Sequence, residues 1–170
     1  MTSGLCWFIV ALVISALPSS SLDKNSSNDD VQAILHLHAQ TREAHLKGDA
    51  ALIAASVHDH FLNVQNGNLE SSTREELRQR FSTYLAHVKY SEWNDVIPPS
   101  VHVSSDGNMA SAAIKIKARF TDLSEPSPRQ EHEFISSWIA VYEKQPAGWR
   151  MTGISSGCEP ACGAARDRRQ

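Results

Sequence analysis

The sequence lacks the motifs of most enzymes that act on phosphates, peptides or metal-activated substrates. It contains no glycine-rich phosphate loop, no GxSxG nucleophile motif and no HExxH zinc motif. Lysine and arginine form no basic stripe, and the net charge is −3 at pH 7. Proteins that bind nucleic acids usually present a strongly basic face. We therefore expect no nucleic-acid partner, and no motif indicates a cofactor.

The chain also lacks an apolar run long enough to span a membrane. The stretch LCWFIVALVISAL has 13 residues, whereas a spanning helix needs about 20. Small and then polar residues follow it, in the order that is typical of a cleaved signal peptide. We predict a signal peptide over 1–21, a disordered linker over 22–29, and a secreted or periplasmic protein without membrane contact after cleavage. A retained anchor is the alternative, because no lysine or arginine precedes the run.

Cysteine is scarce: the chain has three, and Cys6 lies in the predicted signal peptide. Cys158 and Cys162 remain, and an even pair in an exported chain favours a disulfide bond. The bond would close a short loop and add little stability. A redox or metal-binding pair is the alternative, although the spacing is not CxxC and no histidine is near. We assign residues 158–170 to a C-terminal tail.

What the sequence does contain is a change from helical to strand periodicity. Apolar side chains recur every three or four residues over 30–47 and again from 77 onward, and a short apolar helix is predicted between them. Ser72 and Glu75 predict a capping box for the third helix. From residue 90 onward apolar and polar residues alternate, most clearly in MASAAIKIKARF. Helices followed by a meander of strands predict an α+β fold, with one domain over 30–157.

Four stretches, taken in order, resemble the NTF2-like superfamily, in particular its SnoaL-like and ketosteroid-isomerase-like branch. They are AHLKGDAALIAASVHDHF, NGNLESSTREEL, PPSVHVSSDGNMASAAIKIKARF and SSWIAVYEKQPAGWRMTGISS. The resemblance implies a cone in which three N-terminal helices pack on a curved antiparallel sheet, with a pocket between them. It also implies frequent homodimers through the outer face of the sheet. It does not fix a function, since the fold carries isomerases, cyclases, dehydratases and subunits without chemistry.

The sequence departs from the isomerase pattern at the positions that perform the chemistry. The position of the carboxylate base falls on Val64, and both neighbours are amides that take up no proton at neutral pH. The position of the first-helix tyrosine falls on Thr41. On the last strand, Gly153 and Ser155 stand where many relatives place histidine or arginine, and we expect both to face inward. We see no complete catalytic constellation and therefore predict a binding protein.

The side chains expected inside the cone are mostly apolar, with a few hydroxyl groups. Such a lining suits a small hydrophobic molecule, although the same side chains can equally form an ordinary core. The predicted ligand-binding residues are Thr41, Val64, Trp93, Ile116, Phe120, Ser136, Trp138, Tyr142 and Ser155.

Three residues are candidates for acid–base chemistry: His38, Asp95 and His132. A histidine in an apolar pocket can act as a general base, because imidazole titrates near neutrality. The alternative function is therefore a SnoaL-like cyclase, isomerase or dehydratase acting on a hydrophobic, polyketide- or terpenoid-like substrate. A further alternative is an interaction module that uses the fold only to dimerise.

Two histidines on one predicted strand, His58 and His60, raise the possibility of a metal site. They share a strand face, and histidines with a carboxylate suit zinc or iron. Asp59, however, points to the opposite face of the same strand. We therefore expect no metal site.

Overall fold

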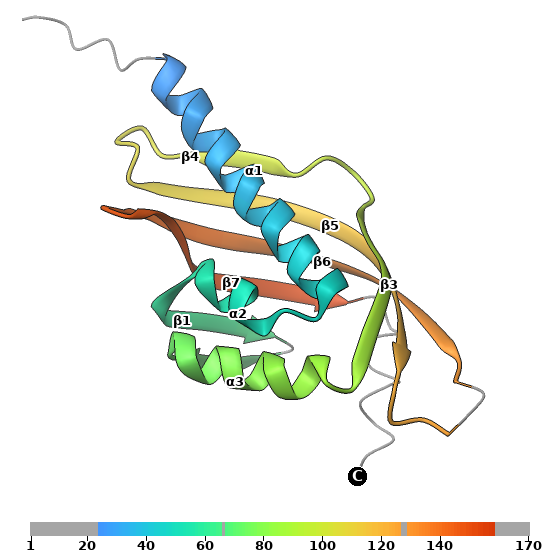
Figure 1. Cartoon of the computed structure of the whole chain (residues 1–170). Coiled ribbons are helices and arrows are strands. Elements are labelled where there is room, and N and C mark those ends of the chain that lie inside the picture. Colours follow the sequence, from blue (N-terminus) through green and yellow to red (C-terminus); the bar gives the residue numbers. More distant parts are fainter. Residues whose placement is uncertain (1–23, 66, 127–128, 159–170) are drawn as a thin grey trace, which may run out of the picture.

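Helix α1 (Lys24–Lys47) crosses the inner face of a curved sheet, while α2 (Ala50–Ala55) and α3 (Arg74–Leu85) pack together near β1 (Figure 1). The computed structural model describes residues 24–65, 67–126 and 129–158. In this part of the chain, no helix is both long enough and apolar enough to cross a membrane. The strands are β1 (Val57–Gln65), β2 (Asn68–Ser72), β3 (Val88–Asp95), β4 (Ser100–Val103), β5 (Met109–Asp122), β6 (Glu131–Gln145) and β7 (Gly148–Cys158).

Local capping chemistry defines where two of the helices begin. The Asp49 carboxylate accepts a hydrogen bond from the Leu52 amide at 2.9 Å and so begins α2. Thr73 and Glu76 form a reciprocal capping box at the start of α3. The box lies one residue later than the predicted one, because Thr73 is the last residue with an extended backbone before the helix.

Helix α1 begins earlier than the sequence pattern indicates. It starts at Lys24, so the expected disordered linker over 22–29 is helical from that residue onward. Once the amphipathic part of a helix is held by tertiary contacts, each further residue needs only propagation and no new nucleus. Asparagine and serine therefore extend the helix despite their modest helix propensity.

The strands form one mixed sheet in the order β2-β1-β7-β6-β5-β3, with β4 also paired to β5. The predicted α+β fold class is confirmed, but the sheet is mixed and not antiparallel throughout as the resemblance implied. All neighbouring pairs are antiparallel except β1 and β7, which run parallel. Where these two strands meet, a Cβ on Gly153 would lie 3.2 Å from the Leu62 carbonyl oxygen, so glycine permits the close approach.

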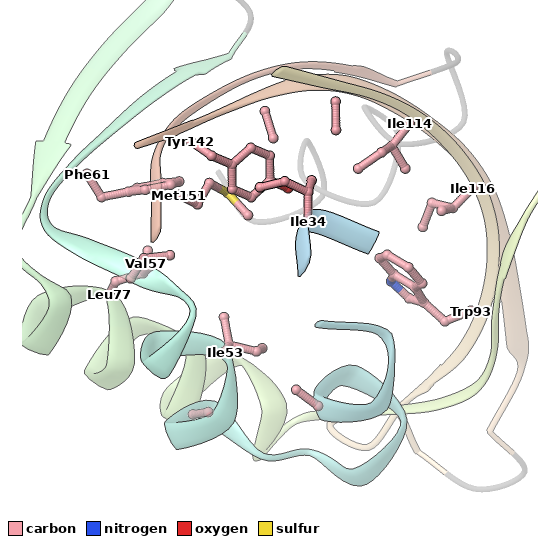
Figure 2. Packing of buried hydrophobic residues seen from close by; sticks show 14 of the residues in the cluster. Ile34, Ile53, Val57, Phe61, Leu77, Trp93, Ile114, Ile116, Tyr142 and Met151 are labelled. Carbon is pink, nitrogen blue, oxygen red and sulfur yellow. The ribbon is translucent and has the colours of Figure 1, made fainter. Parts of the chain in front are cut away.

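The apolar core fills the space between the inner face of the sheet and the helices (Figure 2). On β5, Ile114, Ile116 and Ala118 are buried, and the basic residues between them point to the opposite face, as predicted. Ile34 of α1 has no exposed surface, and Figure 2 shows it between Tyr142 and Trp93. The side of α1 that crosses the sheet is therefore fully enclosed at Ile34.

A polar contact joins the start of α1 to the last hairpin. The Trp149 indole donates its Nε1–H to Asp30 at 2.9 Å, and the Lys144 ammonium lies 2.7 Å from the same carboxylate. Lys144 also lies over the Trp149 ring, 5.6 Å from its centroid. Burial alone would raise the pKa of Asp30, but the bonds from Lys144 and Trp149 outweigh it and hold that pKa below its usual value. We call this contact the α1–hairpin tie.

Candidate functional site

Two of the three acid–base candidates, His38 and Asp95, meet inside the cone. They lie 57 residues apart in the sequence, yet His38 Nε2 is 2.7 Å from Asp95 Oδ1. The His38 side chain is 7 % exposed, whereas the Asp95 side chain is 33 % exposed. The difference arises because α1 and the sheet enclose His38, while Asp95 is the last residue of β3. We call the pair the His38–Asp95 dyad.

The bond determines which nitrogen of His38 is available. An ionised carboxylate only accepts hydrogen bonds, so in the neutral imidazole the proton between the two groups belongs to Nε2. The lone pair is then on Nδ1, and among the described residues no group is hydrogen-bonded to that atom. Asp95 also stabilises the imidazolium that forms when Nδ1 takes up a proton. The dyad therefore has the composition of a general base with an orienting carboxylate.

Two tryptophans flank His38. The His38 ring centroid lies 5.5 Å from that of Trp93 and 6.3 Å from that of Trp138, and the two indoles are 5.8 Å apart. Trp93 is 4 % exposed, while Trp138 is only partly buried. The indoles thus help to bury His38, while Asp95 stays partly exposed. Trp138 also connects the dyad to accessible aromatic surface.

The inner face of the sheet is covered unevenly. The inward residues in the middle of β5 are buried, whereas their neighbours across the sheet are only partly buried. These partly buried inward residues are Phe120, Phe134, Trp138 and Ile154. We call them the open concave surface. Apolar side chains that meet water on a concave face are typical of ligand sites.

Other predicted ligand contacts lie within the core or are bonded to backbone. Ile116 and Tyr142 are each 1 % exposed, so neither belongs to the accessible surface. Burial raises the pKa of Tyr142 to about 12. The Thr41 hydroxyl donates to a carbonyl one helical turn earlier at 3.0 Å, and Ser136 donates to a carbonyl of β7 at 3.2 Å. The predicted hydroxyl groups are thus bonded mainly to the protein itself.

Val64 and Ser155 lie on the outer face of the sheet, which corrects their predicted place in the cone. They are direct partners in the parallel β1–β7 pair, so their side chains share a face. Ser155 also pairs with Ile139, whose side chain is 54 % exposed. On β1 the inward positions belong instead to Asn63 and Gln65. The inward side chains at this end of β1 are therefore amides.

A β-bulge explains why the alternation along β7 was misjudged. In the β6–β7 ladder, Thr152 is an extra residue without a partner on β6. An extra residue reverses which members of the following stretch face inward. Ile154 and Ser156 therefore hold the inward positions that we expected for Gly153 and Ser155.

The third acid–base candidate, His132, lies apart from the dyad. Its Nε2 is 3.1 Å from a Glu125 carboxylate oxygen, and its ring stacks on Phe120 with centroids 5.2 Å apart. It borders the open concave surface through Phe120 but belongs to a different cluster of polar groups.

Neither the metal site considered at His58 and His60 nor the predicted disulfide is seen among the described residues. Among residues 24–158, leaving aside the few that are not described, no three histidine, cysteine or acidic side chains form a metal site. The rings of His58 and His60 lie 6.1 Å apart. The predicted disulfide remains a prediction, because Cys162 lies outside the described residues.

A second histidine of α1, His45, also packs against Trp93, and it was not among the predicted site residues. Its ring stacks on Trp93 with centroids 5.3 Å apart, and its Nδ1 lies 2.7 Å from the Thr41 carbonyl oxygen. Burial lowers the pKa of His45, although the bond to Thr41 opposes the shift. Seven residues separate the two histidines, so they share a face of α1, and this spacing was a signal available in the sequence.

A hollow lies against β5, β6 and β7, mostly on the outer face of the sheet, although Ile114 and Trp138 also border it. Its volume is about 550 Å³. Small and apolar residues dominate its lining, among them Ile97, Pro98, Ala113, Ser137, Ile139 and Ser155.

Comparison with known proteins identifies the fold and no closer relationship. No family model matches the sequence, and none of the curated proteins is similar to it in sequence. Solved structures do match. A nuclear transport factor 2 (NTF2-like) superfamily protein from Salmonella enterica has a TM-score of 0.63 at 18 % identity, covering 77 % of this chain and 92 % of its own.

Two further matches illustrate how widely this fold is used. A ketosteroid isomerase-like protein from Erwinia carotovora atroseptica has a TM-score of 0.61 at 12 % identity, covering 77 % of this chain and 97 % of its own. A putative calcium/calmodulin dependent protein kinase II association domain from Xanthomonas campestris has a TM-score of 0.59 at 17 % identity, covering 86 % and 94 %. The chain thus has the NTF2-like fold, as the sequence resemblance predicted. At these identities the likeness extends to the fold alone.

Proposed function

We propose that this chain binds a small, largely apolar molecule on the open concave surface, with the His38–Asp95 dyad as its polar contact. The observation that carries the proposal is Trp138, whose ring centroid lies 6.3 Å from that of His38 and whose side chain is only partly buried. A ligand that covers this surface removes apolar area from water, worth about 25 cal/mol per Å². One polar group of the ligand would then lie beside the dyad and fix its orientation.

Acid–base catalysis is the second candidate function, and the geometry of the dyad favours it. In this proposal Nδ1 of His38 removes a proton from a carbon next to a carbonyl group of the ligand. Asp95 stays ionised and stabilises the imidazolium, and the same proton returns to another carbon of the ligand. No carboxylate of β1 is needed, because the base comes from α1. This proton transfer would make the protein an isomerase for an apolar substrate. The same proton removal would begin a dehydration if a hydroxyl group on the next carbon then left as water, or a cyclisation if the carbanion attacked a second carbonyl group of the ligand, which would take up the proton.

A matched set of variants tests the binding proposal with 2-naphthol as the probe, an apolar ring system with one hydroxyl group. Titration calorimetry should show saturable binding to the native chain. Trp138→Ala should weaken binding about tenfold, because an aromatic contact is lost. His38→Gln should weaken it severalfold. Ile139→Ala, on the outer face, is the control and should leave the affinity unchanged. Equal affinities in all four proteins would refute the proposal.

Catalysis is tested separately by proton exchange. The protons of 2-tetralone beside its carbonyl group exchange with deuterated water, and NMR follows their loss. The native protein should accelerate the exchange over buffer, while His38→Gln and Asp95→Asn should not. If 2-naphthol binds and no acceleration is seen, the protein binds its ligand without this chemistry.

Export and self-association are also proposals. We propose that the chain is exported after cleavage near residue 21 and forms homodimers through the outer face of the sheet, where Ile139 is exposed beside the hollow that it helps to line. Light scattering should give twice the monomer mass. Ile139→Glu should give the monomer while retaining 2-naphthol binding, and a native chain that stays monomeric at micromolar concentration refutes the dimer.

A further inference from the structure

We propose that Arg42 is a positioning residue that holds Asp95 within reach of His38. The inference rests on the role proposed above for the His38–Asp95 dyad. It concerns a residue on the rim of α1 that would not itself contact the ligand.

The bonds of Arg42 reach the two residues that precede Asp95. Its Nε–H donates to the Trp93 carbonyl oxygen at 2.8 Å, and its Nη2–H donates to Asn94 Oδ1 at 2.7 Å. Arg42 lies one helical turn after His38, on the same side of α1. Helix α1 therefore binds three successive residues of β3, two through Arg42 and Asp95 through His38.

The end of β3 lies at the edge of the sheet, where backbone pairing with β5 continues as far as the Val96 amide, which donates to the Lys115 carbonyl oxygen at 2.8 Å. Asp95 is the last residue of the strand, and the next two residues, Val96 and Ile97, are 46 % and 59 % exposed. On the sheet side the strand end pairs with β5 through Asp95 and Ile116. Ends of edge strands with few packing contacts open locally at low free-energy cost. Without Arg42, α1 would still contact Trp93 through the rings of His38 and His45, but among the described residues its one remaining hydrogen bond to the strand end would be the His38 bond, which is itself the bond to be held.

A second hydrogen bond orients the Asn94 side chain, which is one of the two acceptors of Arg42. The Asn94 side chain donates its Nδ2–H to Glu92 at 3.0 Å, which leaves Oδ1 directed at the guanidinium. Glu92 in turn lies 3.3 Å from Arg119. A surface arginine usually pairs with a carboxylate, but in the described part of the chain Arg42 donates to two neutral oxygens on adjacent residues. That arrangement fixes the position of the backbone and does little to balance charge.

The test follows the proton between His38 and Asp95 by NMR in the full chain. In the native protein, His38 Hε2 should give a resolved signal that exchanges slowly with water. Arg42→Met keeps the aliphatic stem and removes both donors, so exchange of Hε2 should quicken about tenfold, as expected when charge-assisted bonds are lost. Arg42→Lys keeps the charge and one donor and should fall between the two. Arg78→Met, which removes an exposed pair with Glu75, is the control and should leave Hε2 unchanged.

The experiment separates failure of the positioning role of Arg42 from failure of the proposed binding function. If Arg42→Met is folded and its Hε2 signal matches the native one, the positioning role is wrong. If Arg42→Met does not fold, Asn94→Ala serves in its place, because it removes one acceptor of Arg42 only. It should quicken exchange of Hε2 about threefold. An unchanged Hε2 signal in Asn94→Ala also refutes the positioning role of Arg42. If exchange quickens as expected while His38→Gln binds 2-naphthol like the native chain, Arg42 positions the dyad but the dyad is not the ligand contact.

Discussion

Removing the Asp30 carboxylate should destabilise the protein substantially, although Asp30 lies far from the dyad. The carboxylate accepts bonds from two groups of the last hairpin and is 9 % exposed. In Asp30→Ala, the Trp149 N–H is left in a residue that is 4 % exposed, without its acceptor. An unsatisfied buried donor costs about 1–3 kcal/mol. The lost bond to Lys144 adds about 1 kcal/mol, because its side chain is 40 % exposed and can be hydrated.

The total should be a loss of about 3 kcal/mol in the free energy of unfolding, or roughly 6–12 °C in Tm for a chain of this size. Asp30→Asn retains an acceptor for Trp149 and should lose about 1 kcal/mol. Thermal unfolding and urea titration followed by circular dichroism measure both. Glu43→Gln, in an exposed pair with Lys47, is the control and should change stability by less than about 0.5 kcal/mol.

The pH dependence provides the sharper test. The pKa of Asp30 is lower in the folded protein than in the unfolded chain, so its ionisation stabilises the fold above the unfolded value of about 3.9. That contribution disappears as the pH falls through the folded value. The stability difference between the native protein and Asp30→Asn should therefore be constant from pH 7 to about 5 and shrink below pH 4. A difference that persists unchanged at pH 3, or an Asp30→Ala variant that melts within 2 °C of the native protein, would refute the reasoning.

The remaining predictions concern three other positions. Burial lowers the pKa of His45, so the unfolded chain takes up this proton at a higher pH than the folded protein does. The free energy of unfolding should therefore fall as the pH drops below about 6.5, and His45→Phe should remove part of that fall. Urea titrations at pH 7.5 and 5.5 measure this, and an equal loss of stability in both proteins would contradict it. Gly153→Ala should cost about 1–2 kcal/mol, because the added methyl group would lie 3.2 Å from the Leu62 carbonyl oxygen; Gly157→Ala, which meets nothing within 4 Å, is the control. Mass spectrometry of exported protein should show loss of residues 1–21 and a mass 2 Da below that of the free thiols; two free thiols would refute the disulfide.

The helices and the long strands follow from periodicity, because each has one buried face. The alternation of isoleucine and lysine in β5 predicts which side chains enter the core, and the structure confirms it at Ile114 and Ile116. The β7 alternation fails, since a bulge at Thr152 is a property of pairing with β6 and leaves no mark in the local sequence. Val64 was misplaced for a related reason: resemblance located the position to within one residue, and one residue along a strand reverses the face.

The acid–base candidates illustrate what sequence can and cannot reveal about a site. His38 and Asp95 were each proposed separately, but nothing in the chain indicates that residues 57 positions apart lie 2.7 Å apart. That proximity depends on α1 crossing the sheet at β3, which is a tertiary contact. His132 was an equally good candidate by composition, and only the fold separates it from the dyad. Arg42 was overlooked because its partners are a backbone carbonyl and an amide, which no charge pattern predicts.

The contacts of α1 have a mechanical consequence. The helix is bonded to the β6–β7 hairpin at Asp30 and to β3 at His38 and Arg42, positions that span about 18 Å of helix. Helix α1 therefore acts as a rigid body that fixes the distance between the hairpin and the edge strand β3. Widening the cone along this line would break the bonds of Asp30 to Lys144 and Trp149, or the dyad. Entry and release of the proposed ligand should then depend on motion of α3, while α1, the hairpin and β3 move together.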